Sequence, residues 1–144
     1  MISELSGKAL HDSDLVLWAV RSAELLRDGR ALETDEREQI AEELDGIASS
    51  TRRELRSCTV SLLVHLLKVE FQRERHSRSW GVTVANQRRE LHSMLEESPS
   101  LLAVLEQELG GLYESARFEA QVETGLDVFL AANPFTVEQM LRIA

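Results

Sequence analysis

The residue spacing between positions 35 and 72 constrains the fold of this chain more than any other feature. The spacing alternates steps of three and four, which is the period of one face of an α-helix. Its phase runs through Ile40, Leu44, Ile47, Thr51, Leu55, Cys58 and Leu62. The phase does not break at Gly46. We therefore predict one unbroken helix over residues 35–72.

The second half of this segment, residues 55–72, is apolar around about two-thirds of its circumference. Its one polar sector holds Ser61, His65, Lys68 and Gln72. A helix that is apolar over so much of its surface must be wrapped by other helices. Its charged residues and charged flanks argue against a membrane span. We predict that it is the central core helix of the fold.

Capping residues and helical spacing predict the other elements. Residues 1–11 have the character of a loose arm, and a helix follows over 13–28, with Asp12 or Ser13 as its N-cap. A third helix begins around Trp80 and ends near residue 97. Ser98 followed by Pro99 predicts the start of a fourth helix, which ends at Gly125. Thr136 and Gln139 have capping-box spacing and predict a short last helix over 137–143.

No segment shows the alternating period of a strand. The sequence therefore predicts an all-α fold in a single domain, residues 1–144. We expect an antiparallel helical bundle of four main helices and a short C-terminal helix, built around the long central helix. The helix over 13–28 should fold back and cover Ile40, Leu44 and Ile47. A second subunit would complete any cover that it leaves unfinished, so a homodimer is a plausible expectation.

Composition narrows the class of protein. The chain has 144 residues, of which 43% are hydrophobic and 28% charged, in the proportions of a globular domain. Its net charge of -9 argues against non-specific binding to nucleic acid. One Cys excludes an internal disulfide framework and a multi-Cys zinc site. The first residues lack the pattern of a signal peptide, and we expect a cytoplasmic protein that does not bind membranes.

The one basic region of this acidic chain runs from residue 68 to residue 92. It has six basic and three acidic residues, whereas the remainder has ten basic and twenty-two acidic ones. The candidate site is a basic corner, defined as His65, Lys68, Arg75, Arg78, Trp80 and Arg88. Arginine binds phosphate or carboxylate with two parallel hydrogen bonds, and tryptophan stacks on bases or on arginine. The competing interpretation, which we favour, is that these cations neutralise acidic helices of the same molecule.

Two members of this corner, His65 and Lys68, share the polar sector of the central helix. One hypothesis makes the imidazole a general base or ligand and the ammonium an anion holder. The simpler hypothesis, which we prefer, has the imidazole hydrogen-bonded at a helix interface and the lysine stem reaching to water.

No motif for a cofactor or metal is found, and we expect none. Glu38, Glu42 and Asp45 share a helix face, but no histidine stands in the Glu-x-x-His spacing of di-metal bundles. A solvated acidic face is the simpler interpretation. Cys58 falls in the apolar arc of the central helix, which favours an inert thiol.

One stretch, HLLKVEFQRERHSRSWGVTVANQRREL, is followed by SPSL, ETGL and PFTVEQML. Together these motifs resemble a bacterial family, domain of unknown function family 29, from about Asp14 to the end of the chain. The resemblance rests on His65–Lys68, Arg78–Trp80 and Gln87–Arg88. The chain departs from the family pattern at Val69, often Trp, and at Glu74, often Pro. The resemblance implies an all-helical fold and brings no activity with it.

Two functions therefore stay open at this point. The preferred one is a non-enzymatic module that binds another protein, or itself, through a helix face. The alternative is a protein or enzyme that handles phosphate or nucleic acid with the basic corner. The sequence leaves undecided whether the protein is an enzyme.

Overall fold

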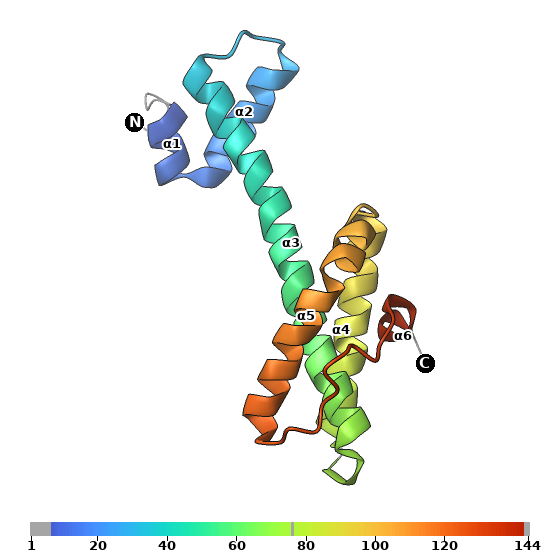
Figure 1. The fold of residues 1–144 in the computed structure, drawn as a ribbon. Helices are drawn as coiled ribbons and strands as arrows, with labels where there is room; N and C mark the ends of the chain where they lie inside the picture. The colour runs from blue at the N-terminus through green and yellow to red at the C-terminus, as the bar shows by residue number, and fades with distance from the viewer. Residues whose placement is uncertain (1–6, 76, 143–144) are drawn as a thin grey trace. The chain divides into compact units, whose positions relative to one another are not determined.

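The computed structural model describes residues 7–75 and 77–142, and every regular element in these ranges is a helix (Figure 1). The elements are α1 (Gly7–Ser13), α2 (Leu15–Arg27), α3 (Thr34–Phe71), the short 3-10 helix η2 (Arg73–Arg75), α4 (Arg78–Glu97), α5 (Leu101–Thr124) and α6 (Val137–Leu141). The predicted all-α fold is confirmed. The long central helix is confirmed too, within one residue of 35–72 at each end.

Contacts divide the chain into two compact units, residues 1–50 and residues 51–144, and α3 contributes to both. The N-terminal unit holds α1, α2 and the first part of α3. The C-terminal unit holds the rest of α3 together with α4, α5 and α6. That residues 1–144 act as a single domain stays a prediction. Within the described ranges, no helix combines the length and the hydropathy needed to cross a bilayer.

In the N-terminal unit, α1 occupies residues that we predicted as a loose arm. Residues 7–11 are helical, and two packed side chains account for this. Leu10 is buried, and the His11 ring meets the Trp18 ring edge-on with 4.8 Å between centroids. Neither contact has a signal in the local sequence. Residues 1–6 of the predicted arm lie outside the described residues.

The predicted helix over 13–28 is α2, which begins two residues later than predicted because its N-cap is Asp14 and not Asp12 or Ser13. The Asp14 carboxylate accepts a hydrogen bond from the Leu17 backbone N–H at 3.0 Å and caps α2. Helix α2 then ends one residue before Asp28, and Gly29 takes the left-handed conformation, with φ of 67°, as a residue after a helix often does.

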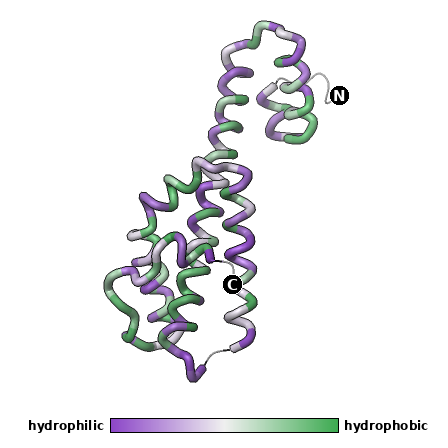
Figure 2. Tube along the Cα trace, turned by 90° about the vertical axis from the view of Figure 1, so that its right-hand side faces the viewer, coloured by the Kyte–Doolittle hydropathy of each residue, from purple (hydrophilic) through white to green (hydrophobic). Residues whose placement is uncertain are grey.

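In the C-terminal unit, α4 runs back along the second part of α3, and α5 reverses direction again (Figure 1). Hydrophobic positions recur along the helices, as Figure 2 shows. The central helix supplies the buried core residues Leu55, Leu62, Leu63, Val64 and Leu67, which pack with Leu91, Leu105, Tyr113 and Ala116 of α4 and α5. Residues 55–72 therefore form the core helix that the sequence predicts.

The start of α5 was predicted two residues too early. Ser98 is the C-cap of α4, since its N–H donates to the Met94 carbonyl oxygen at 2.9 Å. Ser98 and Pro99 then accept from Leu101 and Leu102 in a tight turn, and Ser100 is the N-cap of α5. At the other end, Gly125 closes α5 with φ of 71°, as predicted.

A C-terminal tail, residues 125–142, returns along the unit to place α6 beside α4 (Figure 1). Phe129 is buried and meets Phe71 edge-on at 6.0 Å between ring centroids. The Tyr113 hydroxyl donates to the Leu130 carbonyl oxygen. The predicted capping box of Thr136 and Gln139 is present and opens α6. Residue 143 of the predicted last helix lies outside the described residues.

Candidate functional site

The basic corner begins where α3 ends. Gln72 is buried and its N–H still bonds to the Lys68 carbonyl oxygen at 2.9 Å, after which η2 turns the chain. Ser77 then caps α4 by accepting a hydrogen bond from the Trp80 backbone N–H at 3.4 Å. This turn reverses the chain and brings Trp80 against Lys68.

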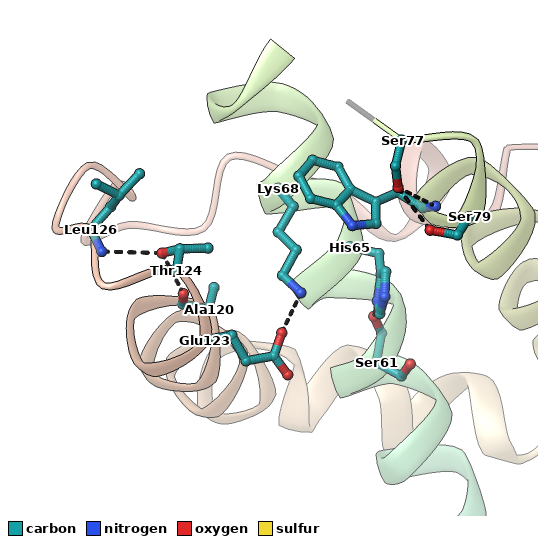
Figure 3. Close-up of polar contacts among 10 residues, drawn as sticks. Ser61, His65, Lys68, Ser77, Ser79, Ala120, Glu123, Thr124 and Leu126 are labelled. Carbon is teal, nitrogen blue, oxygen red and sulfur yellow. Dashed lines mark hydrogen bonds and ion pairs between the residues drawn. The ribbon is translucent and has the colours of Figure 1, made fainter. Parts of the chain in front are cut away.

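The half-buried His65 is held within its own helix. Its Nδ1 lies 2.8 Å from the Ser61 carbonyl oxygen (Figure 3). A carbonyl oxygen only accepts, so Nδ1 carries the hydrogen of this bond. The imidazole is therefore oriented by the backbone four residues earlier. The imidazole is hydrogen-bonded, as in the simpler hypothesis, but to its own helix and not across a helix interface.

Lys68 is engaged by two groups of the same unit. Its ammonium forms an ion pair with the Glu123 carboxylate of α5 (Figure 3) and lies 5.8 Å from the centroid of the Trp80 ring. Only 12% of the Lys68 side chain is exposed. Thr124, the next residue of α5, donates to the Ala120 carbonyl oxygen and accepts from the Leu126 N–H, which completes the end of that helix. Lys68, Trp80 and Glu123 thus form one internal contact, and the lysine does not reach to water as the simpler hypothesis expects.

Arg75 and Arg78 behave differently. Both are exposed, and neither guanidinium has a hydrogen-bond or ion-pair partner among the described residues. The neighbouring Arg73 pairs with Glu70 at 3.0 Å. His76, which stands between Arg75 and Arg78, lies outside the described residues. Of the predicted corner, these two arginines are the cations that the rest of the unit leaves to solvent.

Arg88 is anchored elsewhere. It stands eight residues after Trp80 on α4, about 12 Å further along the helix. Its Nε donates to the Met140 carbonyl oxygen at 2.7 Å, and its Nη2 to the Gln139 carbonyl oxygen at 3.2 Å. Burial, and then the positive charge of Arg142, lower the pKa of Arg88. Arg88 therefore caps the C-terminal end of α6, where orphan carbonyls attract cations.

Several polar contacts had no signal in the sequence. His92 Nε2 lies 2.5 Å from the Leu141 carbonyl oxygen, one turn beyond Arg88. Arg56 and Glu108 form a two-bond ion pair between α3 and α5, with Nε–Oε2 at 2.8 Å and Nη2–Oε1 at 2.9 Å. The hydrogen bonds from Arg56 lower the pKa of Glu108 and, reciprocally, raise that of Arg56. These partners stand 49 and 52 residues apart, too far for any spacing rule.

The remaining candidates show no catalytic geometry. Cys58 is half-buried, and its pKa is raised by burial and then by Glu54 and Glu90, which disfavours the reactive thiolate. Glu38, Glu42 and Asp45 are exposed, as a solvated face would be. Among residues 7–75 and 77–142, no three His, Cys, Asp or Glu side chains gather as metal ligands would. The absence of a metal or cofactor stays a prediction.

The contacts define a class: an all-helical protein whose polar clusters join one helix to another. This chain belongs to the family described as domain of unknown function DUF29, whose model matches residues 10–144. That match confirms the family resemblance found in the motifs. No curated protein and no solved structure matches the chain.

Proposed function

We propose that this protein is a non-enzymatic interaction module that forms a homodimer through one face of α2. The observation that carries the proposal is the exposure of that face. Leu15, Val16, Val20 and Leu26 are 51%, 76%, 51% and 53% exposed. At 100° per residue these four lie with Ala19 and Ala23 in an arc of about 140°. Arg27, the last residue of the helix, is the one charged residue of α2 within this arc.

The opposite side of α2 is already used. Trp18 is buried, and it lines a small cavity of about 140 Å³ with Leu10 of α1, Leu25 of α2 and Ile40 of α3. Helix α2 is therefore apolar on both sides but covered on one. A helix with that pattern is normally buried all round. The uncovered side supports a binding surface, because contiguous exposed apolar patches on soluble proteins usually mark interaction sites.

A second copy fits this face better than an unrelated partner does. In an antiparallel two-fold pair, Ala19 and Ala23 meet at the centre and allow close approach. Val16 of one copy then lies opposite Leu26 of the other, at both ends. The face is therefore self-complementary, which a two-fold dimer requires. In the same unit, Leu44 and Ile47 of α3 are 62% and 64% exposed, so the prediction that the helix over 13–28 covers them is wrong.

Size and charge predict a weak dimer. Helix α2 is about 20 Å long, and pairing two such faces buries on the order of 1,000 Å², the low end for specific interfaces. We expect a dissociation constant on the order of 10 μM. Each copy carries a net charge of -9, so the two repel one another. Added salt screens this repulsion and should strengthen the dimer.

Sedimentation velocity over a concentration series tests the proposal. The wild type should shift from monomer to dimer, whereas Val16→Glu and Val20→Glu should stay monomeric with unchanged helical circular dichroism. Phe118→Glu is the matched control, since Phe118 is 69% exposed on α5. It should dimerise like the wild type. A wild type that stays monomeric at several hundred micromolar overturns the proposal, and so does a dimer lost with Phe118→Glu but kept with Val16→Glu.

The alternative, a phosphate- or nucleic-acid-handling protein, has less support. Lys68 is paired with Glu123, and Arg88 is occupied by the carbonyls of α6. Only Arg75 and Arg78 of the corner are exposed without a partner among the described residues. Replacing these two by Ala should abolish phosphate or oligonucleotide binding under this alternative. Wild-type protein that binds neither ligand counts against it.

A further inference from the structure

A groove between α4 and α6, in the C-terminal unit, has a lining unlike the rest of this acidic chain. It encloses about 460 Å³, within the range of small-molecule sites. Gly81, Val84 and Ala85 of α4 line one part of it. The other lining residues are Arg88, Arg89, His92 and Arg142. The groove therefore has an apolar stretch and a cationic stretch, and no carboxylate of residues 7–75 or 77–142 lines it.

The two stretches are separated along the helix axis. The three small or apolar residues belong to the first turns of α4, and Arg88, Arg89 and His92 follow in the next turns. From Gly81 to His92 the groove follows α4 for about 16 Å. Arg142, the C-cap of α6, adds its charge. An occupant that matches this order has an apolar end and an anionic end.

The positive charges of the groove are not neutralised within the described residues. Arg88, Arg89 and Arg142 form no ion pair there, and the repulsion between Arg88 and Arg142 contributes to the lowered pKa of Arg88. Glu70 lines an adjoining cavity with the same two arginines, but its carboxylate is already paired with Arg73. Arg88 gives two of its five N–H donors to the carbonyls of α6, which leaves donors for an anion.

We propose that this groove binds a small amphiphilic carboxylate, with its apolar chain along Gly81, Val84 and Ala85 and its carboxylate at Arg89 and Arg142. An arginine pair suits a carboxylate because each guanidinium offers parallel donors. The apolar chain would replace water on the side chains of α4, which contributes the hydrophobic part of the affinity. This inference concerns a surface other than the face of α2 and does not depend on dimerisation.

Decanoate is the probe, and amide chemical shifts of the full-length protein, read by NMR, are the measurement. Decanoate below its micelle concentration should give saturable shifts along residues 81–92, with a dissociation constant on the order of 100 μM. Acetate has the charge without the chain, and decanol has the chain without the charge. Both should bind at least roughly fivefold more weakly. Equal binding of decanol, or no saturable shift with decanoate, overturns the proposal.

Variants locate the two ends of the probe. Arg89→Gln and Arg142→Gln should each weaken decanoate binding by up to about fivefold, the upper end for one exposed charge pair. Ala85→Asp should abolish binding, and the unchanged amide spectrum elsewhere shows that the fold is kept. Arg78→Gln is the matched control, because Arg78 is an exposed cation of α4 outside the groove. If Arg78→Gln lowers affinity as much as Arg89→Gln, the effect is general charge and the site is refuted. Binding by a glutamate-rich peptide but not by decanoate refutes it too.

Discussion

The two units of this protein cover their apolar residues to different degrees. In the described part of the N-terminal unit, Leu10 and Trp18 are the only buried hydrophobic residues, and six large hydrophobic residues are exposed. The C-terminal unit buries a contiguous cluster that includes Leu55, Leu62 and Leu105. A unit of 50 residues rarely supplies a sufficient core by itself. The described part of the C-terminal unit also exposes seven large hydrophobic residues, but it has a buried cluster of its own. We therefore expect the smaller unit to depend more on surfaces outside its own helices.

Polar anchors differ in the same way. The C-terminal unit fixes its helices with the paired Arg56 and Glu108, with Arg88 on α6, and with Tyr113 on the tail. The N-terminal unit has one such long-range contact in its described part, between His11 of α1 and Glu43 of α3. We call the C-terminal unit the scaffold, because it has a packed core, and the N-terminal unit the platform, because it exposes one face of α2. Trp18 and Trp80 stand in different units, so their fluorescence can report on each separately.

The largest expected effect is in the scaffold. Leu105→Ala removes a side chain with 0% exposure from the core of the C-terminal unit and should cost about 2–5 kcal/mol of unfolding free energy. Urea unfolding followed by Trp80, in a Trp18→Phe background, measures it. Leu102→Ala is the matched control, since Leu102 is 40% exposed on the same helix, and should cost less than about 1 kcal/mol. Equal costs would break the claim that this unit has a true core.

The second effect tests whether the platform unfolds by itself. Leu10→Ala removes one of its two buried hydrophobic side chains and should cost about 2 kcal/mol. The Trp18 signal should then move to lower urea, while the Trp80 signal keeps its midpoint. A common shift of both signals would show one cooperative domain, as residues 1–144 were predicted to be.

The sequence predicts elements that repeat a local signal better than elements whose bounds depend on tertiary contacts. The phase of α3 is a local signal that repeats over 38 residues, so its bounds were predicted within one residue. Helix α1 depends on Leu10 and on the His11–Trp18 contact, which are tertiary. Ser98 is a good capping residue, but its N–H completes α4, so α5 begins after Ser100. At Ser98 the hydrogen bond that ends α4 outweighs the preference of this residue for starting a helix.

The candidate site shows the same limit. The helical phase correctly places His65 and Lys68 in a polar sector of the core helix, where the side chains are half-buried. It cannot identify Glu123, the partner of Lys68, because the two are 55 residues apart. Arg88 was grouped with Arg75 and Arg78 because they are close in sequence. The fold instead turns Arg88 toward Met140, and only the tertiary path of the tail decides that.

The third effect concerns the anchor of the tail. Arg88→Met keeps the aliphatic stem but removes the donors to the Gln139 and Met140 carbonyls, and should cost about 1–2 kcal/mol. Hydrogen exchange should show faster exchange of amides in residues 137–142, with the amides of α3 little changed. Arg78→Met, an exposed cation of the same helix, should leave both unchanged. Retained protection of α6 in Arg88→Met would show that the other contacts of the tail, among them buried Phe129 and Met140, hold it without Arg88.

The smallest effect is a pH dependence confined to the platform. Hydrogen bonds with Glu43, and then with Asp12, raise the pKa of His11 above its ordinary value of about 6.5. The folded unit therefore favours the protonated imidazole. Its contribution to stability is fully present below about pH 6.5 and is lost as the pH rises through the folded pKa. The urea midpoint of the Trp18 signal should fall as the pH rises above about 6.5. In His11→Gln, and in Glu43→Gln, that fall should be reduced, whereas an undiminished fall in both would assign it to other groups. Because His11 of α1 pairs with Glu43 of α3, this experiment measures how much the contact between these two helices stabilises the N-terminal unit.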